Sequence, residues 1–369
     1  MKFVKTDDLK EGMRLAKPIY NRNGVMLYER DSKLTMQGIN SIRNFELIGI
    51  YVLEPAEPVP PMTPFDVEFE RFQTIAIFSL KDNLKLLLEK SSSKELSKLV
   101  TVIEEQYGQL DEKVQFVQNI RSRQDYVYKH TLNVAILCAL MAGAMKLSKR
   151  EKMDVIMAAL LHDIGKLLLP KELLYRTEEL SPEEMKTLAK CKEEAYNRLL
   201  LDYDLAANAR IIISQFTKLE QGGDYVEGTL KGTMMLCVAE VYDYMTAMKL
   251  GEDSMSTIQA MQYLRKHQDD FGKDVVDALF AAIQVLVPGV CVQLTNGDKA
   301  AVIRENLEDV MRPVVLSLST HEAYDLADPK VFQKFQVKDV MKTMDNRYVM
   351  DRAILEEYKG KLSYKRRQK

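Results

Sequence analysis

Hydrophobic residues recur at intervals of three and four along the middle of the chain, from about residue 121 to residue 287. The stretch "LSKREKMDVIMAALLHDIGK" is representative, because Ser148 and Glu151 at its start have the spacing of a helix capping box. Its apolar residues follow an i, i+3, i+4 pattern: Met153, Ile156, Met157, Leu160, Leu161 and Ile164. The pattern predicts a helix with one buried face, and Gly165 is predicted to end it.

The two ends of the chain alternate between apolar and polar residues instead. Near the N-terminus, "MRLAKPIYNRNGVMLYER" carries an Asn-Gly turn between two alternating runs. After "VPGV", the stretch "CVQLTNGDKAAVIRE" predicts a second hairpin around Asn296-Gly297, and "RPVVLSLS" predicts a third strand. Both ends are therefore expected to be small β-rich modules.

A change of composition marks the boundary between the first module and the helices. The segment "EPAEPVPPMTP" (54–64) contains five prolines in eleven residues, which is typical of a linker. The residues that follow are predicted to be helical, with Ser92 and Glu95 at capping-box spacing. The predicted domains are a β-rich N-terminal module (1–56), a proline-rich linker with a helical segment (57–120), a helical domain (121–287) and a β-rich C-terminal module with a basic tail (288–369). The predicted fold class is multi-domain α+β, with a central all-α bundle flanked by the two β-rich modules.

Composition limits the classes of function. Of 369 residues, 46% are hydrophobic and 29% charged, and the net charge is −2, which argues against binding to a nucleic-acid polymer. The first residues contain no apolar signal core, and the longest apolar stretch (133–145) is too short to span a membrane. No pair of cysteines has C-x-x-C spacing, which suits reduced thiols. The expected location is the cytoplasm, with no membrane contact.

The first candidate chemistry lies in "AALLHDIGK" (158–166). His162 and Asp163 come at the end of the predicted helix, where free carbonyl groups and the helix dipole favour a cation. A metal ion would satisfy this position. A solvated helix end would give the same pattern.

Two further stretches place ionisable residues on apolar faces. In "DYVYKHTLNVAILCALMAGAM", His130 lies on the inward stripe of its helix, either as a metal ligand or as a core histidine with a protein partner. In "MMLCVAEVYDYMTAM" (234–248) the only acids are Glu240 and Asp243, three residues apart and so on one face. Burying them is costly unless they are paired or bind a metal, and the alternative is that both reach an exposed edge.

The order of these motifs resembles the HD superfamily of metal-dependent phosphohydrolases. The wider frame is similar to its HD-GYP branch, the cyclic di-GMP phosphodiesterases. The resemblance rests on "DYVYKHTLNVAIL", on "AALLHDIGKLLLPKELLYRTEELSPEEMKTL" and on "TLKGTMMLCVAEVYDYM", and it covers nearly all of 121–285. It implies an HD-type helical bundle in which paired metal ions activate water and neutralise a phosphodiester.

Several ligand positions of that family differ here. The chain has only four histidines, and the family's further histidine positions align with Cys191, Gln215 and Phe216. A thiol, a weak amide oxygen and a phenyl ring are poor replacements for three imidazoles, so a second metal ion is not expected. Cys191 could bind a softer ion as a thiolate, or it could simply fill the core.

Other parts of the signature also differ. The arginine before the family's last acid appears as Met234, and the acid itself as Glu240 rather than aspartate. What remains of the GYP sequence is Gly223, Asp224 and Tyr225.

Carried over residue by residue, the resemblance implies a site for at most one divalent metal, iron, manganese or zinc. Its ligands would be His130, His162, Asp163 and Glu240. Asp163 and Lys166 would be the catalytic residues if any turnover remains. Lys166 and Lys231, the latter in "LKGT", would contact the phosphate of a ligand.

Three hypotheses follow from the sequence. The first is a degenerate HD-GYP protein of cyclic dinucleotide signalling, with little or no phosphodiesterase activity, that binds a cyclic dinucleotide or a protein partner. The second is an active metal-dependent phosphohydrolase or phosphodiesterase that uses a single-metal His-His-Asp-Glu site on a smaller phosphate ester or a nucleotide. The third is a scaffold without metal or ligand, in which the β-rich modules make protein contacts. A homodimer is compatible with all three.

Overall fold

The computed structural model describes residues 2–44, 49–53, 64–90, 94–116, 125–174, 180–223, 228–247 and 254–340. The predicted linker up to residue 63, Ser92, Asp224, Tyr225 and the basic tail lie outside these ranges. Contacts divide the chain into two compact units, which are described separately. The first comprises Met1–Glu112, Val117–Ser254 and His267–Leu279, and the second Lys113–Phe116, Met255–Lys266 and Phe280–Lys369. The domain boundaries drawn from the sequence stay predictions.

The first unit begins with a small antiparallel sheet. Its strands, in the order β1-β5-β2, are Lys2–Lys5, Gly49–Leu53 and Arg14–Leu15. A short helix, η1 (Thr6–Asp8), follows β1, and α1 (Met36–Asn44) contributes Ile39 and Ile42 to the core of this module. The predicted Asn-Gly turn joins β3 (Ile19–Tyr20) to β4 (Met26–Tyr28), and Gly24 adopts the positive φ of +72° that such a turn requires.

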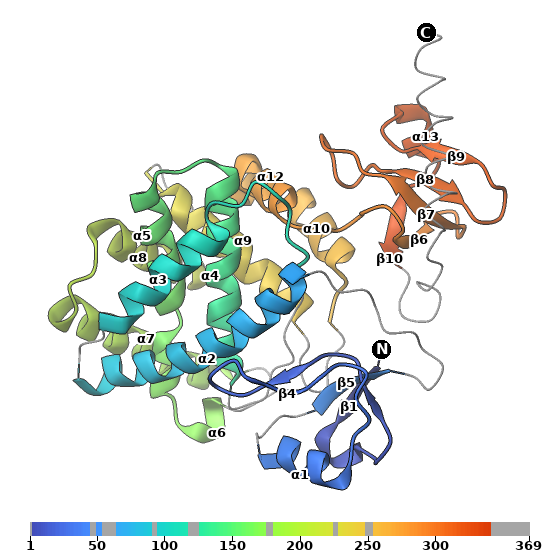
Figure 1. Cartoon of the computed structure of the whole chain (residues 1–369). Helices are drawn as coiled ribbons and strands as arrows, with labels where there is room; N and C mark the ends of the chain where they lie inside the picture. Colours follow the sequence, from blue (N-terminus) through green and yellow to red (C-terminus); the bar gives the residue numbers. More distant parts are fainter. Residues whose placement is uncertain are drawn as a thin grey trace. The chain divides into compact units, whose positions relative to one another are not determined.

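The rest of the first unit is helical (Figure 1). Its main helices are α2 (Pro64–Lys90), α3 (Lys94–Tyr107), α4 (Tyr126–Ala144), α5 (Lys149–Leu161), α7 (Pro182–Asp202), α8 (Ala207–Glu220) and α9 (Lys231–Thr246). Shorter pieces are η2 (Ile164–Leu168), α6 (Lys171–Leu174) and α11 (Gln268–Phe271), and most of α12 (Lys273–Ala282) also belongs here.

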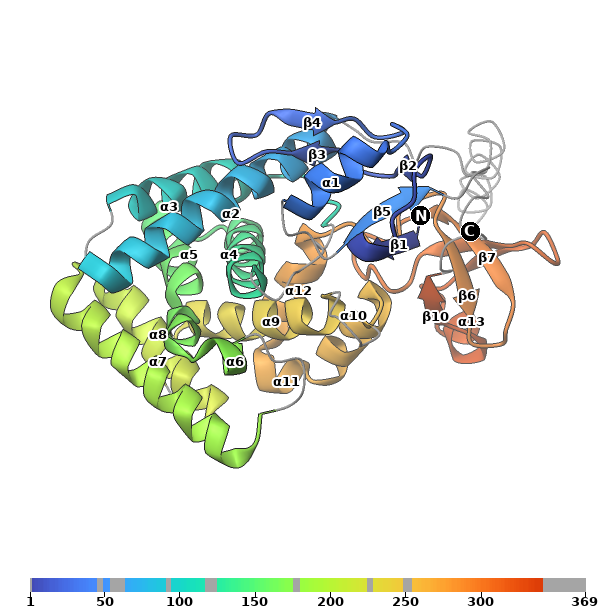
Figure 2. The ribbon, with the colours of Figure 1, turned by 90° about the horizontal axis from the view of Figure 1, so that it is seen from below.

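Helix α4 is the centre of this bundle. Every residue from His130 to Ala142 is buried, which fits a helix that is apolar on all sides. It packs against α5 and α9, and α2 and α3 also contact it (Figure 2). Among the described helices, only α4 has the length and composition to cross a membrane, and 78% of that stretch is buried inside the protein. Its apolar character is therefore explained by its place in the core.

One predicted capping box, that of Ser148 and Glu151, begins its helix where the sequence indicates. Ser148 and Glu151 cap α5 reciprocally, and Ser181 and Glu184 do the same for α7. The predicted stop at Gly165 is wrong, because α5 ends at Leu161 and Gly165 lies inside η2. Gly165 serves a different purpose: a Cβ built there would lie 2.4 Å from the Cα of Lys192 on α7, so only glycine allows this approach.

The second unit contains α10 (Thr257–Lys266), a five-stranded antiparallel sheet and α13 (Pro329–Lys334). The sheet order β10-β6-β7-β8-β9 corresponds to Val337–Val340, Cys291–Leu294, Lys299–Arg304, Val314–Ser317 and Ala323–Asp325. The predicted hairpin at Asn296-Gly297 joins β6 to β7, and the predicted third strand is β8. The fold class predicted from the sequence is confirmed: an α-rich bundle with β-rich modules at both ends of the chain.

Candidate metal centre

The candidate site lies where α4, the turn after α5, and α9 meet in the core of the bundle. Helix α4 supplies His130, and α5 ends so that His162 is its C-cap and Asp163 is the N-cap of η2. Helix α9 supplies Glu240. The close packing of these three elements follows from their long runs of buried apolar residues, so the rigid core sets the positions of the polar side chains.

One ligand atom from each of these four residues lies within 4.8 Å of the others. Glu240 Oε2 is 2.7 Å from His130 Nε2 and 3.1 Å from His162 Nε2. Asp163 Oδ2 lies 3.5 Å from His130 Nε2 and 3.7 Å from His162 Nε2. His130, His162 and Asp163 are buried, whereas the side chain of Glu240 is 22% exposed, so the cluster has one open side.

The second nitrogen of each imidazole is already engaged. His162 Nδ1 donates to the carbonyl of Ala159 at 2.6 Å, and His130 Nδ1 donates to Asp243 Oδ2 at 2.6 Å. These partners fix the tautomers and direct both Nε2 atoms at the cluster. A metal-binding histidine needs this kind of support.

The cluster fits a divalent metal ion. Two of its buried atoms, His130 Nε2 and Asp163 Oδ2, have no hydrogen bond of acceptable geometry among the described residues. Buried polar atoms without such a bond are rare in native proteins, and a shared cation would satisfy both. Two imidazole nitrogens and two carboxylates are a donor set that suits iron, manganese or zinc.

Asp243, which the sequence analysis noted as an acid on the face of Glu240 but did not assign to the site, supports His130. It is fully buried, and besides His130 it accepts a hydrogen bond from Asn133 Nδ2 at 3.1 Å. Asn133 in turn accepts one from Gln73 of α2 at 3.3 Å. The signal was present in the sequence, since Asp243 lies on the same face of α9 as Glu240.

Two lysines flank Asp163. Lys166, three residues further along η2, pairs with Asp163 Oδ2, and its side chain is 23% exposed. Lys192 of α7 lies 3.0 Å from Asp163 Oδ1, and only 6% of its side chain is exposed. Its ammonium also bonds both carboxylate oxygens of Glu220, each at 2.6 Å. The sequence analysis did not predict Lys192 or Glu220, because it assigned the functional position on α7 to Cys191.

These contacts shift the ionisation of the cluster. Burial alone would lower the pKa of His130, but the negative charge of Glu240 and the hydrogen bond to Asp243 outweigh it and raise that pKa to about 9. Burial raises the pKa of Glu240, but the two histidines overcome this and hold it well below its usual range. In the same way, Lys166 and Lys192 overcome the burial of Asp163 and keep its pKa low. The carboxylates are therefore charged at neutral pH.

The three replaced ligand positions contribute no donor to the cluster. Phe216 is buried and presents its ring edge-on to His162, with ring centroids 5.4 Å apart. Gln215 Oε1 accepts from Leu230 N at 3.0 Å and from Thr233 Oγ1 at 2.7 Å, which ties α8 to the start of α9. Burial raises the pKa of the Cys191 thiol, which disfavours the thiolate that a metal would need.

Lys231 is separate from the cluster. It is the first residue of α9, nine residues before Glu240, which corresponds to roughly 13 Å of helix. Its amine lies 2.6 Å from Asp274, and 62% of its side chain is exposed. The structure thus brings together His130, His162, Asp163, Glu240 and Lys166, and it leaves Lys231 at the surface.

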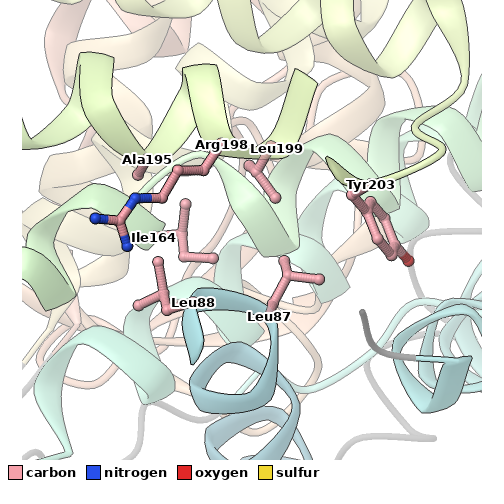
Figure 3. Close-up of a pocket in the computed structure, with 7 residues that line it drawn as sticks. All are labelled: Leu87, Leu88, Ile164, Ala195, Arg198, Leu199 and Tyr203. Carbon is pink, nitrogen blue, oxygen red and sulfur yellow. The ribbon is translucent and has the colours of Figure 1, made fainter. Parts of the chain in front are cut away.

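A shallow pocket lies beside the HD turn, between α2, η2 and α7 (Figure 3). Its cavity volume is about 10 Å³, and it is lined mainly by Leu87, Leu88, Ile164, Ala195 and Leu199, with Arg198 and Tyr203 at its sides. Ligand pockets usually enclose roughly 300–1,000 Å³. This pocket is therefore too small and too apolar for a nucleotide.

Comparisons with known proteins also find an HD domain in the part of the chain that contains the four-residue cluster. The profile of the HD domain family matches residues 115–275. The chain is 21% identical over 201 residues to the cyclic di-GMP phosphodiesterase PA4108 of Pseudomonas aeruginosa, covering 53% of this chain and 49% of that protein. It is 22% identical over 160 residues to the 3'3'-cGAMP-specific phosphodiesterase 1 of Vibrio cholerae, covering 42% of this chain and 36% of that protein. The chain thus aligns with about half or less of the length of these relatives.

A similar solved structure is that of Bd1817, a HDG"Y"P protein from Bdellovibrio bacteriovorus. The match has a TM-score of 0.41 and 12% sequence identity, and it covers 75% of this chain and 97% of the other. The domain match and the His-Asp cluster at the end of α5 lead to one conclusion: residues 115–275 of this chain form an HD domain, which is similar to part of these cyclic dinucleotide phosphodiesterases.

Proposed function

We propose that this protein acts in cyclic dinucleotide signalling as a binding protein with one divalent metal ion and little or no phosphodiesterase activity. The metal would be held by His130, His162, Asp163 and Glu240. Both relatives named above are phosphodiesterases of cyclic dinucleotides, which supports a ligand of this class.

One observation carries the proposal: the two oxygens of Asp163 have different surroundings. Oδ2 points at the histidines and pairs with the partly exposed amine of Lys166, whereas Oδ1 lies 3.0 Å from the buried amine of Lys192. Two-metal phosphodiesterases need a second ion to stabilise the attacking and leaving oxygens together. With a lysine beside Oδ1 and a phenyl ring at Phe216, a second ion has too few ligands here.

The four-residue cluster could still support chemistry on its own. When bound, a single divalent ion acidifies water and polarises a phosphoryl group. Lys166 is partly exposed, so its ammonium could meet a phosphate oxygen while it remains beside Asp163. This favours a second candidate function, a single-metal phosphohydrolase that acts on a cyclic dinucleotide or on a smaller phosphate ester.

Calorimetry and product analysis on the same purified chain separate the two functions. With Mn²⁺ present, the proposed function predicts binding of cyclic di-GMP and no hydrolysis above that of a His162→Ala variant. Metal-dependent hydrolysis of cyclic di-GMP or of bis(p-nitrophenyl) phosphate that disappears in His162→Ala would establish the second function. Absence of both binding and hydrolysis would reject both and leave the scaffold hypothesis.

A further inference from the structure

Lys192 is one of the most deeply buried charges of the bundle. Only 6% of its side chain is exposed, and its amine contacts Asp163 on one side and Glu220 on the other. A buried ammonium costs several kcal/mol unless such partners compensate. A lysine at this position therefore requires that two carboxylates be held around its amine.

The backbone is arranged to bring this amine to the site. Helix α7 lies directly on η2, and the Cα of Lys192 comes within 2.4 Å of the place that a Cβ of Gly165 would occupy. This close approach puts Lys192 next to the HD turn, so that its chain reaches Asp163 Oδ1. The residue beside it, Cys191, contributes no ligand to the cluster.

The charges around the site balance with one divalent ion. Four carboxylates (Asp163, Glu220, Glu240 and Asp243) face two ammonium groups (Lys166 and Lys192), an excess of two negative charges when both histidines are neutral. One divalent ion cancels this excess. A second one would leave a net positive charge in a buried site, which is strongly unfavourable.

We propose that Lys192 is a built-in cation that takes the place of a second metal ion: it holds Asp163 Oδ1, is held by Glu220, and restricts the centre to one metal. This inference rests on the proposed single-metal site and assigns a positioning role to a residue of α7. It also gives Glu220 a purpose, since this carboxylate at the end of α8 anchors the amine from the other side.

Mn²⁺ titration of the metal-free full chain tests the proposal, with bound metal counted by elemental analysis and affinity measured by calorimetry. The wild type is expected to bind one Mn²⁺. Lys192→Gln removes the charge and leaves oxygen donors from Asp163, Glu220 and the new amide, so it is expected to bind a second equivalent. Lys190→Gln, on the exposed face of the same helix, is the matched control and is expected to keep one.

The outcomes distinguish this inference from the proposed function. One Mn²⁺ in the wild type and two in Lys192→Gln supports both. One Mn²⁺ with unchanged affinity in Lys192→Gln rejects the role of Lys192 but leaves the single-metal site intact. Two ions in the wild type, or none, reject the single-metal site and the inference with it.

A second variant keeps the test decisive if Lys192→Gln does not fold. Glu220→Gln removes one of the two negative charges beside the ammonium without changing the four-residue cluster, so the positive charge of Lys192 then acts mainly on Asp163. The affinity for the first Mn²⁺ is expected to fall by about tenfold. An unchanged affinity in a folded Glu220→Gln variant would overturn the proposal.

Discussion

Asp163 divides the candidate centre into two halves that are built differently. On the side of Oδ2, two histidines and Glu240 converge from α4, α5 and α9, and the partly exposed amine of Lys166 also pairs with this oxygen. On the side of Oδ1, the neighbours are the amine of Lys192 and, beyond it, Glu220. The first half offers ligand atoms of three further residues to a metal ion, whereas the second is occupied by the buried ammonium of Lys192, which already binds Glu220.

The difference between the halves follows their place in the fold. The first half is carried mainly by α4, which is buried from His130 to Ala142, and by α9, which is largely buried. The second half is carried by α7 and α8, which have long exposed faces. A polar group in the deep core must keep its partners or destabilise the protein. Helices with exposed faces can exchange a ligand for another side chain at lower cost.

The largest effect is expected when the first half is broken. His162→Ala removes one of the two nitrogen donors and should lower Mn²⁺ affinity by more than about 100-fold, because losing a mere supporting residue already costs 10–100-fold. Elemental analysis and calorimetry on the purified variant measure this. His267→Ala, which removes a histidine paired with Asp270 away from the cluster, is the control. Full metal occupancy in His162→Ala would show that the cluster is not the metal centre.

A smaller loss is expected when the support of the first half is weakened. Asp243→Asn keeps the shape of the side chain but removes the negative charge that holds His130 Nδ1. Metal affinity should fall by about 10–100-fold, while the fold is retained. Titration with Mn²⁺ measures the loss, and the exposed substitution Asp270→Asn should change nothing. Equal affinities of the two variants would mean that His130 needs no carboxylate partner.

The first half could be predicted from the sequence, and the reason lies in its residue types. His130, the His162-Asp163 pair and Glu240 are ionisable residues inside long apolar runs, where burial without a partner is unfavourable. Helical periodicity placed His130 on an inward face, and the resemblance to the HD superfamily added Glu240 and the His162-Asp163 pair to the same ligand set. The main helices, both hairpins and the capping box at Ser148 were predictable for similar reasons, since each has a local sequence signal.

The second half could not be predicted, because no local signal marks it. Lys192 lies in "AKCKEEAY", where lysines and glutamates read as a solvated helix face. Its burial depends on how α7 packs against η2, and that contact depends on Gly165, which the sequence suggested only as a helix stop. Glu220 is 28 residues away from its partner Lys192. Such pairings are set by tertiary structure alone.

The ionisation of His130 gives a test of the first half that needs no mutation. Its pKa is raised from 6.5 to about 9 in the folded, metal-free protein, and metal binding requires the neutral ring. Mn²⁺ should therefore displace about one proton at pH 7.5, and affinity should rise by up to tenfold per pH unit until about pH 9. Calorimetry in two buffers with different ionisation enthalpies measures the proton. Binding without proton release at pH 7.5 would contradict the predicted charge of His130.

The raised pKa of His130 also affects the stability of the metal-free protein, which should fall as the pH rises, whereas the metal affinity increases. A raised pKa means that the folded chain retains a proton which the unfolded chain loses above pH 6.5. The stabilisation from His130 is therefore fully present below pH 6.5 and is lost as the pH rises through about 9. Denaturant unfolding of metal-free protein across this range should show the decline. Saturating Mn²⁺ should remove it, because the metal then takes the place of the proton.

The smallest effect is expected at Lys231, which belongs to neither half. Its amine and Asp274 form an exposed pair, so Lys231→Ala should change the free energy of unfolding by less than about 1 kcal/mol. Mn²⁺ affinity should stay within about twofold of the wild type, because roughly 13 Å of helix separates this residue from Glu240. If Lys231 contacts the phosphate of a cyclic dinucleotide, calorimetry should show a several-fold loss of cyclic di-GMP affinity, and raising the salt concentration should reduce the difference. If Lys231→Ala also lost Mn²⁺ affinity, Lys231 and the metal cluster would be coupled. The expectation that this surface residue is independent of the centre would then be wrong.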